Sequence, residues 1–499
     1  MSSTKTRKRV TEVPPHFQFY DPRLWSILEQ TMLIVRRRDF SQASPFSYRY
    51  VNQELAPFTS EKGRVLYEGA VEAALAIQLF ELGECPSRSM QEIIQACVGL
   101  RARDVYRLEY GVPRRIKAVR HDVRALVMLI KSAISETSQR YPHLMLTSCD
   151  VLDTADAARM RDAIITVIIP LLKKLLRHFI RIARQYADTV QAGRTHLQLA
   201  SPITFGDAID EYVCRLAGEI AKLEREVGML VGKISGPVGT YGPSSLIMNN
   251  PMRFEKQLLG HLGLKPGRYS HQKNMPEPMA DVYHRLTMIM GIFGDLADSL
   301  RRLQATEISE VAQAKALQGR SSIMAHKNNP IAVENVKSMN KAELGRMIGV
   351  YLDLITEHQR DLTNSASGRF HFEILEFVCT AAKTLNRIMA TLVVDESQML
   401  KNLELKGDLI ISDPLNTLLT YYGYPSAYAY VADVCDSAAE SGAKVYDLLM
   451  ADESVAPFVA KMTPKQLRVL RQPRLYIGLA SWRTKRNADH WENRLQLAA

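Results

Sequence analysis

Apolar residues recur along much of the chain at alternating spacings of four and three positions, which is the period of helices packed along a shared seam. The longest such stretch extends over three heptads, from residue 282 to residue 303. Strict alternation of apolar and polar residues is scarce, so we predict a mostly all-α fold with a minor sheet. The predicted seams are Val282, Leu286, Ile289, Phe293, Leu296, Leu300 and Leu303; Leu216, Ile220, Leu223, Val227 and Leu230; Leu344, Met347, Tyr351 and Leu354; and Phe377, Leu385, Ile388 and Leu392.

The composition is that of a globular chain with a large core, with 46% apolar and 23% charged residues among 499. Its six cysteines form no CxxC pair, which argues against a disulfide scaffold and favours a reducing compartment. The most apolar run, residues 164–172, is too short to span a membrane, and the first ten residues lack the apolar segment of a secretory signal. We therefore expect a cytoplasmic protein without a membrane partner.

The net charge of +11 is unevenly distributed along the chain. Residues 1–9 contribute +4 and residues 461–499 contribute +7, so the sequence between them is neutral. A basic surface can bind nucleic acid, but solvated basic ends on a neutral enzyme are the favoured interpretation. We do not expect a nucleic-acid partner, and we expect the first 40 residues to be dispensable for activity.

Several familiar cofactor motifs are missing from the sequence. It contains no phosphate-binding GxxxxGK[ST] loop, no GxGxxG after a strand, no HExxH and no clustered Cys/His spacing, so we expect neither a metal nor a cofactor. What remains are short polar clusters near the ends of apolar helices, and each of them alone is more typical of turns or solvated helix faces. The clusters are residues 120–122, 143–150, 193–196, 321–329 and 360–369.

The order of these clusters resembles the fumarase/aspartase superfamily. The segment SSIMAHKNNP at 321–330 is similar to its signature loop, and residues 147–155 and 193–206 are similar to two further superfamily segments. Within the superfamily the likeness is to the adenylosuccinate lyase family, on residues 48–55, the Arg120-His121-Asp122-Val123 segment, residues 236–241, and the spacing of Arg360, Ser365 and Arg369.

The resemblance implies three helical domains around a long central bundle, in a homotetramer whose active sites take segments from three subunits. It divides the chain into a basic N-terminal extension (1–44), an N-terminal helical domain (45–146), a central bundle (147–395), a C-terminal helical domain (396–480) and a basic tail (481–499). The implied reaction is a β-elimination that breaks a C–N bond and releases fumarate. The implied substrates are adenylosuccinate, which yields AMP, and the succinyl-carboxamide ribotide of purine biosynthesis.

The resemblance also implies roles for individual residues. Ser321 would be the base, made effective by Lys327 and nearby backbone N–H groups, and His196 would protonate the leaving nitrogen. His121 would either orient the substrate or act on it through a neighbouring residue. The implied substrate-binding residues are Arg49, Tyr50, Arg120, Asp122, Thr147, Ser148, Gln272, Ser322, Asn329, Asn335, Arg360, Ser365 and Arg369.

The sequence departs from the family pattern at Arg320, Ala325, Asn328 and residues 275–278. These departures affect the choice of substrate more than the class of reaction. Alternatives are therefore an argininosuccinate lyase-like, carboxymuconate cycloisomerase-like or specialised-metabolism enzyme of the superfamily. A catalytically inactive or nucleic-acid-binding relative is a further alternative.

Overall fold

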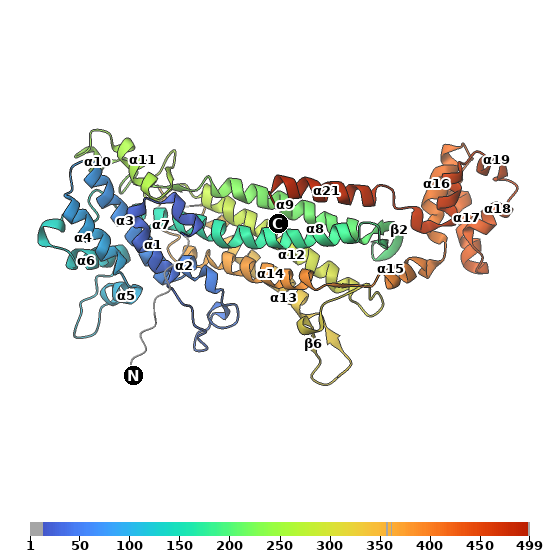
Figure 1. Cartoon of the computed structure of the whole chain (residues 1–499), viewed down its shortest axis with the longest axis horizontal. Helices are drawn as coiled ribbons and strands as arrows, with labels where there is room; N and C mark the ends of the chain where they lie inside the picture. Colours follow the sequence, from blue (N-terminus) through green and yellow to red (C-terminus); the bar gives the residue numbers. More distant parts are fainter. Residues whose placement is uncertain (1–12, 356–357, 361, 498–499) are drawn as a thin grey trace. The chain divides into compact units, whose positions relative to one another are not determined.

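The computed structural model describes residues 13–355, 358–360 and 362–497, and nearly all of its regular structure is helical (Figure 1). The all-α prediction is confirmed, because the strands in these residues are short and pair only in twos. None of the described helices is long and apolar enough to cross a membrane. The strands are β1 (Val190–Thr195), β2 (Gln198–Thr204), β3 (Val231–Gly232), β4 (Lys265–Pro266), β5 (Val311–Ala312), β6 (Gly319–Arg320), β7 (Asn328–Asn329) and β8 (Val393–Val394).

The chain divides into two compact units. Unit 1 contains the described residues up to 172, together with 220–290 and 339–381; unit 2 contains 173–219, 291–338 and the described residues from 382 onward. Five long helices have residues in both units. They are α8 (Ile169–Gln185), α9 (Phe205–Val227), α12 (Glu277–Leu303), α13 (Ile331–Leu352) and α14 (Glu373–Ala390).

Helix α3 (Glu61–Glu81) forms much of the core of unit 1 and packs against α4 and α7. The Ser60 hydroxyl accepts the N–H of Gly63 at 3.1 Å and caps its N-terminus. Small residues allow close approach: a Cβ at Gly69 would lie 2.7 Å from a methyl of Leu100. The other helices within unit 1 are α1 (Trp25–Met32), α2 (Ala56–Thr59), α4 (Ser87–Val98), α5 (Ala102–Tyr110), α6 (Asp122–Ser132), α7 (Ser148–Ala163), α10 (Gly242–Ser245) and α11 (Pro251–His261).

The segment from residue 13 to residue 34 packs into unit 1, although we assigned it to an N-terminal extension. Phe17, Tyr20 and Leu24 are buried, and the Tyr20 hydroxyl donates to the buried carboxylate of Asp162 on α7 at 2.6 Å. The hydroxyl of Tyr67 donates to the same carboxylate oxygen at 2.7 Å. Deleting the first 40 residues would remove these buried groups, so we now expect only residues 1–12 to be dispensable.

Unit 2 contains the β1–β2 hairpin and a group of C-terminal helices with their own apolar core, which includes Leu415, Leu419 and Val445. The stretch that we assigned to a basic tail contains α21, whose Asn487 donates to Asp210 of α9 at 2.7 Å. The C-terminal helices are α15 (Glu396–Leu403), α16 (Ser412–Tyr421), α17 (Ala427–Ser441), α18 (Val445–Ala451), α19 (Ala456–Val459), α20 (Pro464–Arg471) and α21 (Ala480–Arg494).

Burial confirms three of the four predicted seams and corrects the other. The seams on α9, α12 and α14 are buried along nearly their full length, and only their end residues Leu303 and Leu392 are half-buried. On α13 the predicted seam is not the face buried within the chain, because Leu344 and Tyr351 are 51% and 44% exposed and only Met347 of the predicted set is buried. Both faces of α13 are apolar at helical spacing, so the sequence pattern could not distinguish the buried face from the exposed one.

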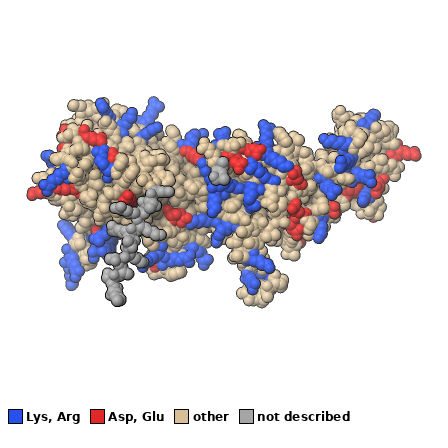
Figure 2. All heavy atoms as spheres, in the orientation of Figure 1, with Lys and Arg blue, Asp and Glu red and all other residues tan. Residues whose placement is uncertain are grey.

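The excess positive charge of the sequence lies at the two ends of the chain, but individual charged side chains of both signs occur throughout it. Figure 2 shows Lys and Arg scattered among Asp and Glu across the visible face. The cysteines in the described residues are free, and four of the six are buried.

Candidate active site

A cavity of about 610 Å³ lies in unit 1 and is lined only by residues of that unit. It is formed by the N-terminal half of α7, the segment before α12 and the start of that helix, and the chain between α13 and α14. The structure brings more than half of the predicted site residues to this cavity, from segments up to 249 positions apart, residue 120 to residue 369. They are Arg120, His121, Asp122, Thr147, Ser148, Gln272, Arg360, Ser365 and Arg369.

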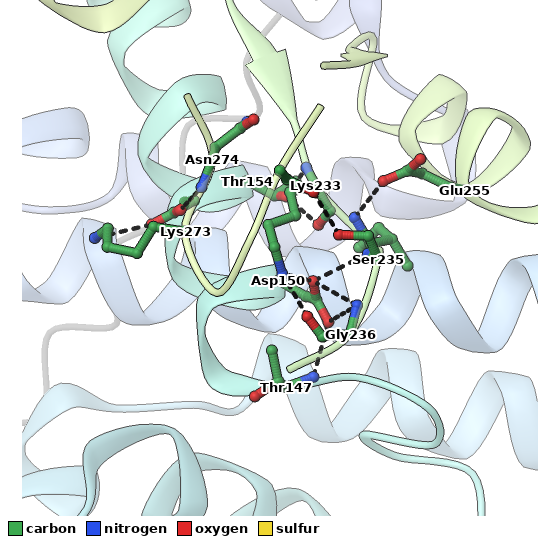
Figure 3. Close-up of polar contacts among 12 residues, drawn as sticks. Thr147, Asp150, Thr154, Lys233, Ser235, Gly236, Glu255, Lys273 and Asn274 are labelled. Carbon is green, nitrogen blue, oxygen red and sulfur yellow. Dashed lines mark hydrogen bonds and ion pairs between the residues drawn. The ribbon is translucent and has the colours of Figure 1, made fainter. Parts of the chain in front are cut away.

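The N-terminus of α7 contributes Thr147 and Ser148 to the cavity wall. The buried side chain of Asp150 accepts the backbone N–H of Thr147 at 2.8 Å, which sets the first turn of the helix (Figure 3). The free N–H groups and dipole of a helix N-terminus favour a negatively charged ligand. This end of the cavity wall is therefore suited to a carboxylate.

His121 joins the starts of two helices. It caps α6, where its Nδ1 accepts the backbone N–H of Arg124 at 3.4 Å, and its Nε2 lies 3.2 Å from the hydroxyl oxygen of Ser148. The preceding residue, Arg120, has a left-handed backbone with φ of 58°. Strained positions of this kind occur often at functional sites, and this one directs the chain into α6 beside the cavity.

The cavity is lined by six basic and six acidic side chains, but their pairing is uneven. Arg64, Arg159 and Lys273 each form an ion pair with a carboxylate. In the described residues, Arg120, Arg360 and Arg369 form no ion pair with a carboxylate, although the charge of Arg369 acts on Glu109. Arg360 donates to the carbonyls of residues 353 and 354, and Arg369 donates to that of Ser365. The charges of these three guanidinium groups are therefore not neutralised by an ion pair in the described residues. Each could bind an anion, which arginine contacts in bidentate fashion.

Lys273 and His371 are among the titratable groups of the cavity that sequence reasoning missed. Lys273 lies 3.1 Å from a carboxylate oxygen of Asp153. Burial is the largest single influence and disfavours the charged amine, but Asp153 together with Cys149 and Asp156 raises the pKa of Lys273 overall. His371 lies 3.2 Å from Asp353, yet burial prevails there and lowers the pKa of the imidazole. Lys273 follows the predicted site residue Gln272 by one position, and His371 follows Arg369 by two. This proximity in sequence is the signal that could have identified them.

Two predicted residues of unit 1 do not line the cavity. Arg49 is exposed and Tyr50 is half-buried, and both donate their backbone N–H groups to the carbonyl of Pro45. Their role as substrate-binding residues stays a prediction.

Ser321 belongs to unit 2, in a hairpin formed by the antiparallel strands β6 and β7. Its hydroxyl oxygen accepts the backbone N–H groups of Met324 at 3.0 Å and Ile323 at 3.3 Å. Hydrogen bonds of this kind lower the cost of an alkoxide on the serine. The remaining predicted residues of unit 2 in this part of the chain are Ser322, Lys327, Asn329 and Asn335.

His196 also belongs to unit 2 and lies at the exposed turn between β1 and β2. His196 and Leu197 both have a left-handed backbone, with φ of 51° and 64°. Two successive residues of positive φ form the tight turn that joins right-twisted strands, so the hairpin presents the imidazole at its tip.

Comparison with known proteins covers nearly the whole chain. Residues 36–344 match the family described as Lyase, and residues 356–469 match the family described as Adenylosuccinate lyase C-terminal. The adenylosuccinate lyase of Pyrococcus abyssi is 29% identical over 441 residues, covering 87% of this chain and 95% of its own length. That of Thermotoga maritima is 31% identical over 360 residues, covering 70% of this chain and 80% of its own length.

Solved structures share the fold. A fumarate lyase from Mesorhizobium sp. BNC1 superposes with a TM-score of 0.76 at 21% identity, covering 88% of this chain and 98% of its own. The 3-carboxy-cis,cis-muconate lactonizing enzyme of Pseudomonas putida gives a TM-score of 0.75 at 23% identity, covering 89% and 98%. At such identities the likeness establishes the helical architecture alone.

Proposed function

The chain belongs to the adenylosuccinate lyase family of the fumarase/aspartase superfamily, and from that membership we propose that it cleaves adenylosuccinate to AMP and fumarate. The same reaction on the succinyl-carboxamide ribotide would give it a second step in purine biosynthesis. The observation that carries the proposal is the cavity of unit 1, where a helix N-terminus and three arginines that form no ion pair in the described residues line a single space. A substrate with carboxylates and a phosphate matches that set of groups.

Each end of the substrate has a suitable partner. Thr147, Ser148 and Gln272 offer neutral donors for the succinyl carboxylates beside the positive end of α7. Arg360, Ser365 and Arg369 offer two cations and a hydroxyl for the phosphate and ribose.

The elimination needs a base and an acid. Ser321 removes the proton from the carbon adjacent to the C–N bond, the electron pair forms the double bond of fumarate, and the C–N electrons leave with the nitrogen. His196 protonates that nitrogen, a task suited to an imidazole that titrates near neutral pH. The backbone N–H groups donated to Ser321 support its role as the base, because they favour the deprotonated oxygen.

We further propose a homotetramer whose active sites combine residues from different copies. Helix α13 and the residues after it display Leu344, Ile348, Tyr351 and Ile355, which are 44–76% exposed and spaced by four, three and four positions. An exposed apolar stripe at seam spacing is typical of a helix that packs against another copy. A shared site also explains why the cavity is lined by unit 1 alone while Ser321 and His196 belong to unit 2.

Mixing two impaired variants tests the shared site. At adenylosuccinate concentrations well below the raised KM of Arg369→Ala, we expect that variant and Ser321→Ala each to be weak alone. If a site combines the two residues from different copies, some sites in mixed oligomers contain neither substitution and activity returns. Activity that remains at the sum of the separate variants contradicts the shared site.

The assay for the proposed activity uses the purified full chain with adenylosuccinate and follows the ultraviolet change as AMP forms. We expect turnover, with fumarate as the second product by chromatography. Turnover of argininosuccinate or another succinyl adduct in place of adenylosuccinate would overturn the proposed substrate. The free cysteines favour a reducing compartment, and we propose the cytoplasm.

A further inference from the structure

A buried ion pair lies behind the cavity wall in unit 1. Lys233 is 1% exposed and Asp150 is 0% exposed, and the Lys233 Nζ lies 2.5 Å from a carboxylate oxygen of Asp150. Neither residue lines the cavity. Nothing in the reaction described above uses either charge.

The carboxylate of Asp150 accepts four donors from two separate segments (Figure 3). The first segment is the N-terminus of α7, through the N–H of Thr147 at 2.8 Å. The second follows β3 and supplies Lys233 Nζ and the N–H groups of Ser235 and Gly236, at 2.5–3.3 Å. Lys233 also donates to the carbonyl of Gly236 at 2.9 Å, so the pair joins the helix start to the loop after β3.

A third segment, which carries Gln272, is attached to the same loop. The hydroxyl oxygens of Ser235 and Ser270 lie 2.7 Å apart. The approach is close, since a Cβ at Gly239 would lie 2.0 Å from the carbonyl oxygen of Ser270. The positions of Thr147 and Gln272 in the cavity wall therefore both depend on the loop that Lys233 and Asp150 hold.

Net stability does not explain such a pair well. Removing two charges from water offsets most of their mutual attraction, and buried pairs replaced by apolar residues often leave stability unchanged or higher. A fully hydrogen-bonded buried pair fixes the local geometry, because each donor must be directed at its own acceptor. A helix start that binds a carboxylate requires that geometry.

We propose that Lys233, acting through Asp150, is a positioning residue for the carboxylate-binding part of the cavity. The proposal rests on the proposed function, since it takes Thr147, Ser148 and Gln272 as the groups that bind the succinyl carboxylates. Loss of the ammonium weakens binding of a dicarboxylate and leaves binding of the nucleotide, which the residues 360–369 hold, nearly unchanged.

The test measures the two products as separate inhibitors of the full-length enzyme. In Lys233→Met we expect the inhibition constant of fumarate to rise about tenfold and that of AMP to change less than about twofold. The matched control is Arg161→Met, because Arg161 is also buried, pairs with Asp162 on the same helix and lies outside the cavity. It should lower the melting temperature without changing the ratio of the two constants.

Ser235→Ala removes only the hydroxyl contact with Ser270 and serves if Lys233→Met fails to fold. We expect a rise of about threefold in the fumarate constant alone. Fumarate inhibition that is unchanged in a folded variant, or that weakens in parallel with AMP, overturns the positioning role. Wild-type enzyme that fails to turn over adenylosuccinate overturns the proposed function instead, so the two failures are distinguishable.

Discussion

The N-terminus of α7 in unit 1 and the β6–β7 hairpin in unit 2 both carry predicted site residues, but they are built differently. Asp150 is fully buried and accepts four donors, so the residues beside it have little freedom. Ser321 is half-buried in a hairpin whose residues 322–328 are all exposed, and its hydroxyl contacts only the backbone of its own loop. The binding groups of unit 1 are thus held by buried contacts, whereas the proposed base lies in an exposed hairpin of unit 2.

The two histidines show the same contrast. His121 caps α6 and lies 3.2 Å from Ser148, so its ring is oriented by two helix starts. His196 is at the exposed tip of a hairpin. The orientation of His121 is therefore fixed within unit 1, whereas His196 is presented on an exposed turn of unit 2.

The largest expected effect is at the proposed base and acid. Ser321→Ala should lower kcat at least about a thousandfold and His196→Ala by about 10²–10⁴-fold, because each removes a proton-transfer group. The KM should change little, since the binding cavity lies in unit 1. Steady-state kinetics and size-exclusion chromatography check both points, with Ser441→Ala as the control. Near-normal kcat in either variant would make the assigned role wrong.

A smaller effect, on KM and not mainly on kcat, is expected for a substrate-binding residue of unit 1. Arg369→Ala should raise the KM for adenylosuccinate by about 10–100-fold with a lesser loss of kcat, since a hydrogen bond to a charged group contributes about 1.5–3 kcal/mol. The exposed Arg468 on α20 provides the matched control, Arg468→Ala. A fall in kcat with unchanged KM would place Arg369 with the reacting groups and weaken the contrast between the units.

Stability should depend on pH through a buried carboxyl of unit 1. Glu343 is 0% exposed and receives one hydrogen bond, from Thr287 at 2.6 Å, and burial raises its pKa from 4.5 to about 7. The folded state therefore binds the proton more tightly than the unfolded state. The free energy of unfolding should fall by about 3 kcal/mol as the pH rises from 4.5 to 7.

Glu343→Gln should remove that fall, which denaturant unfolding at pH 5.5 and pH 8 would measure. The comparison in unit 2 is Asp210→Asn, because burial raises the pKa of Asp210 from 3.8 to about 6 and its effect is confined to lower pH. An unchanged pH dependence in Glu343→Gln would mean that the glutamate stays ionised in the folded enzyme.

The smallest effect is expected for deletion of the first twelve residues, which include the basic N-terminal segment. Deleting residues 1–12 should leave kcat/KM within about twofold, because the deletion keeps the buried side chains that the structure describes nearest to it, such as Phe17 and Tyr20. Activity and RNA binding are measured on the same preparation. Loss of activity would give the basic segment a part in catalysis, and retained RNA binding would locate any such affinity elsewhere.

Much of the fold was predictable because helix periodicity is local. The seams of α9, α12 and α14 followed from residues a few positions apart, and their burial agrees. The predicted seam of α13 differs from the face that is buried within the chain, because both faces of this helix are apolar. Only the neighbouring helices determine which face is covered. Lys233 was missed for a related reason: nothing in its local sequence indicates that Asp150, 83 positions away, is its partner.

By itself, the amino-acid sequence determined the helical class, the chemical types in each polar cluster and, by their order, the family. The tertiary structure alone decided that segments around residues 120, 147, 272 and 360 share one cavity and that Ser321 and His196 belong to the other unit. It also decided that three arginines of the cavity form no ion pair within the part of the chain that the structure describes. The physical reason is that periodicity records only which side of a helix is apolar. Which polar groups meet, and which are desolvated, depends on contacts between residues far apart in the chain.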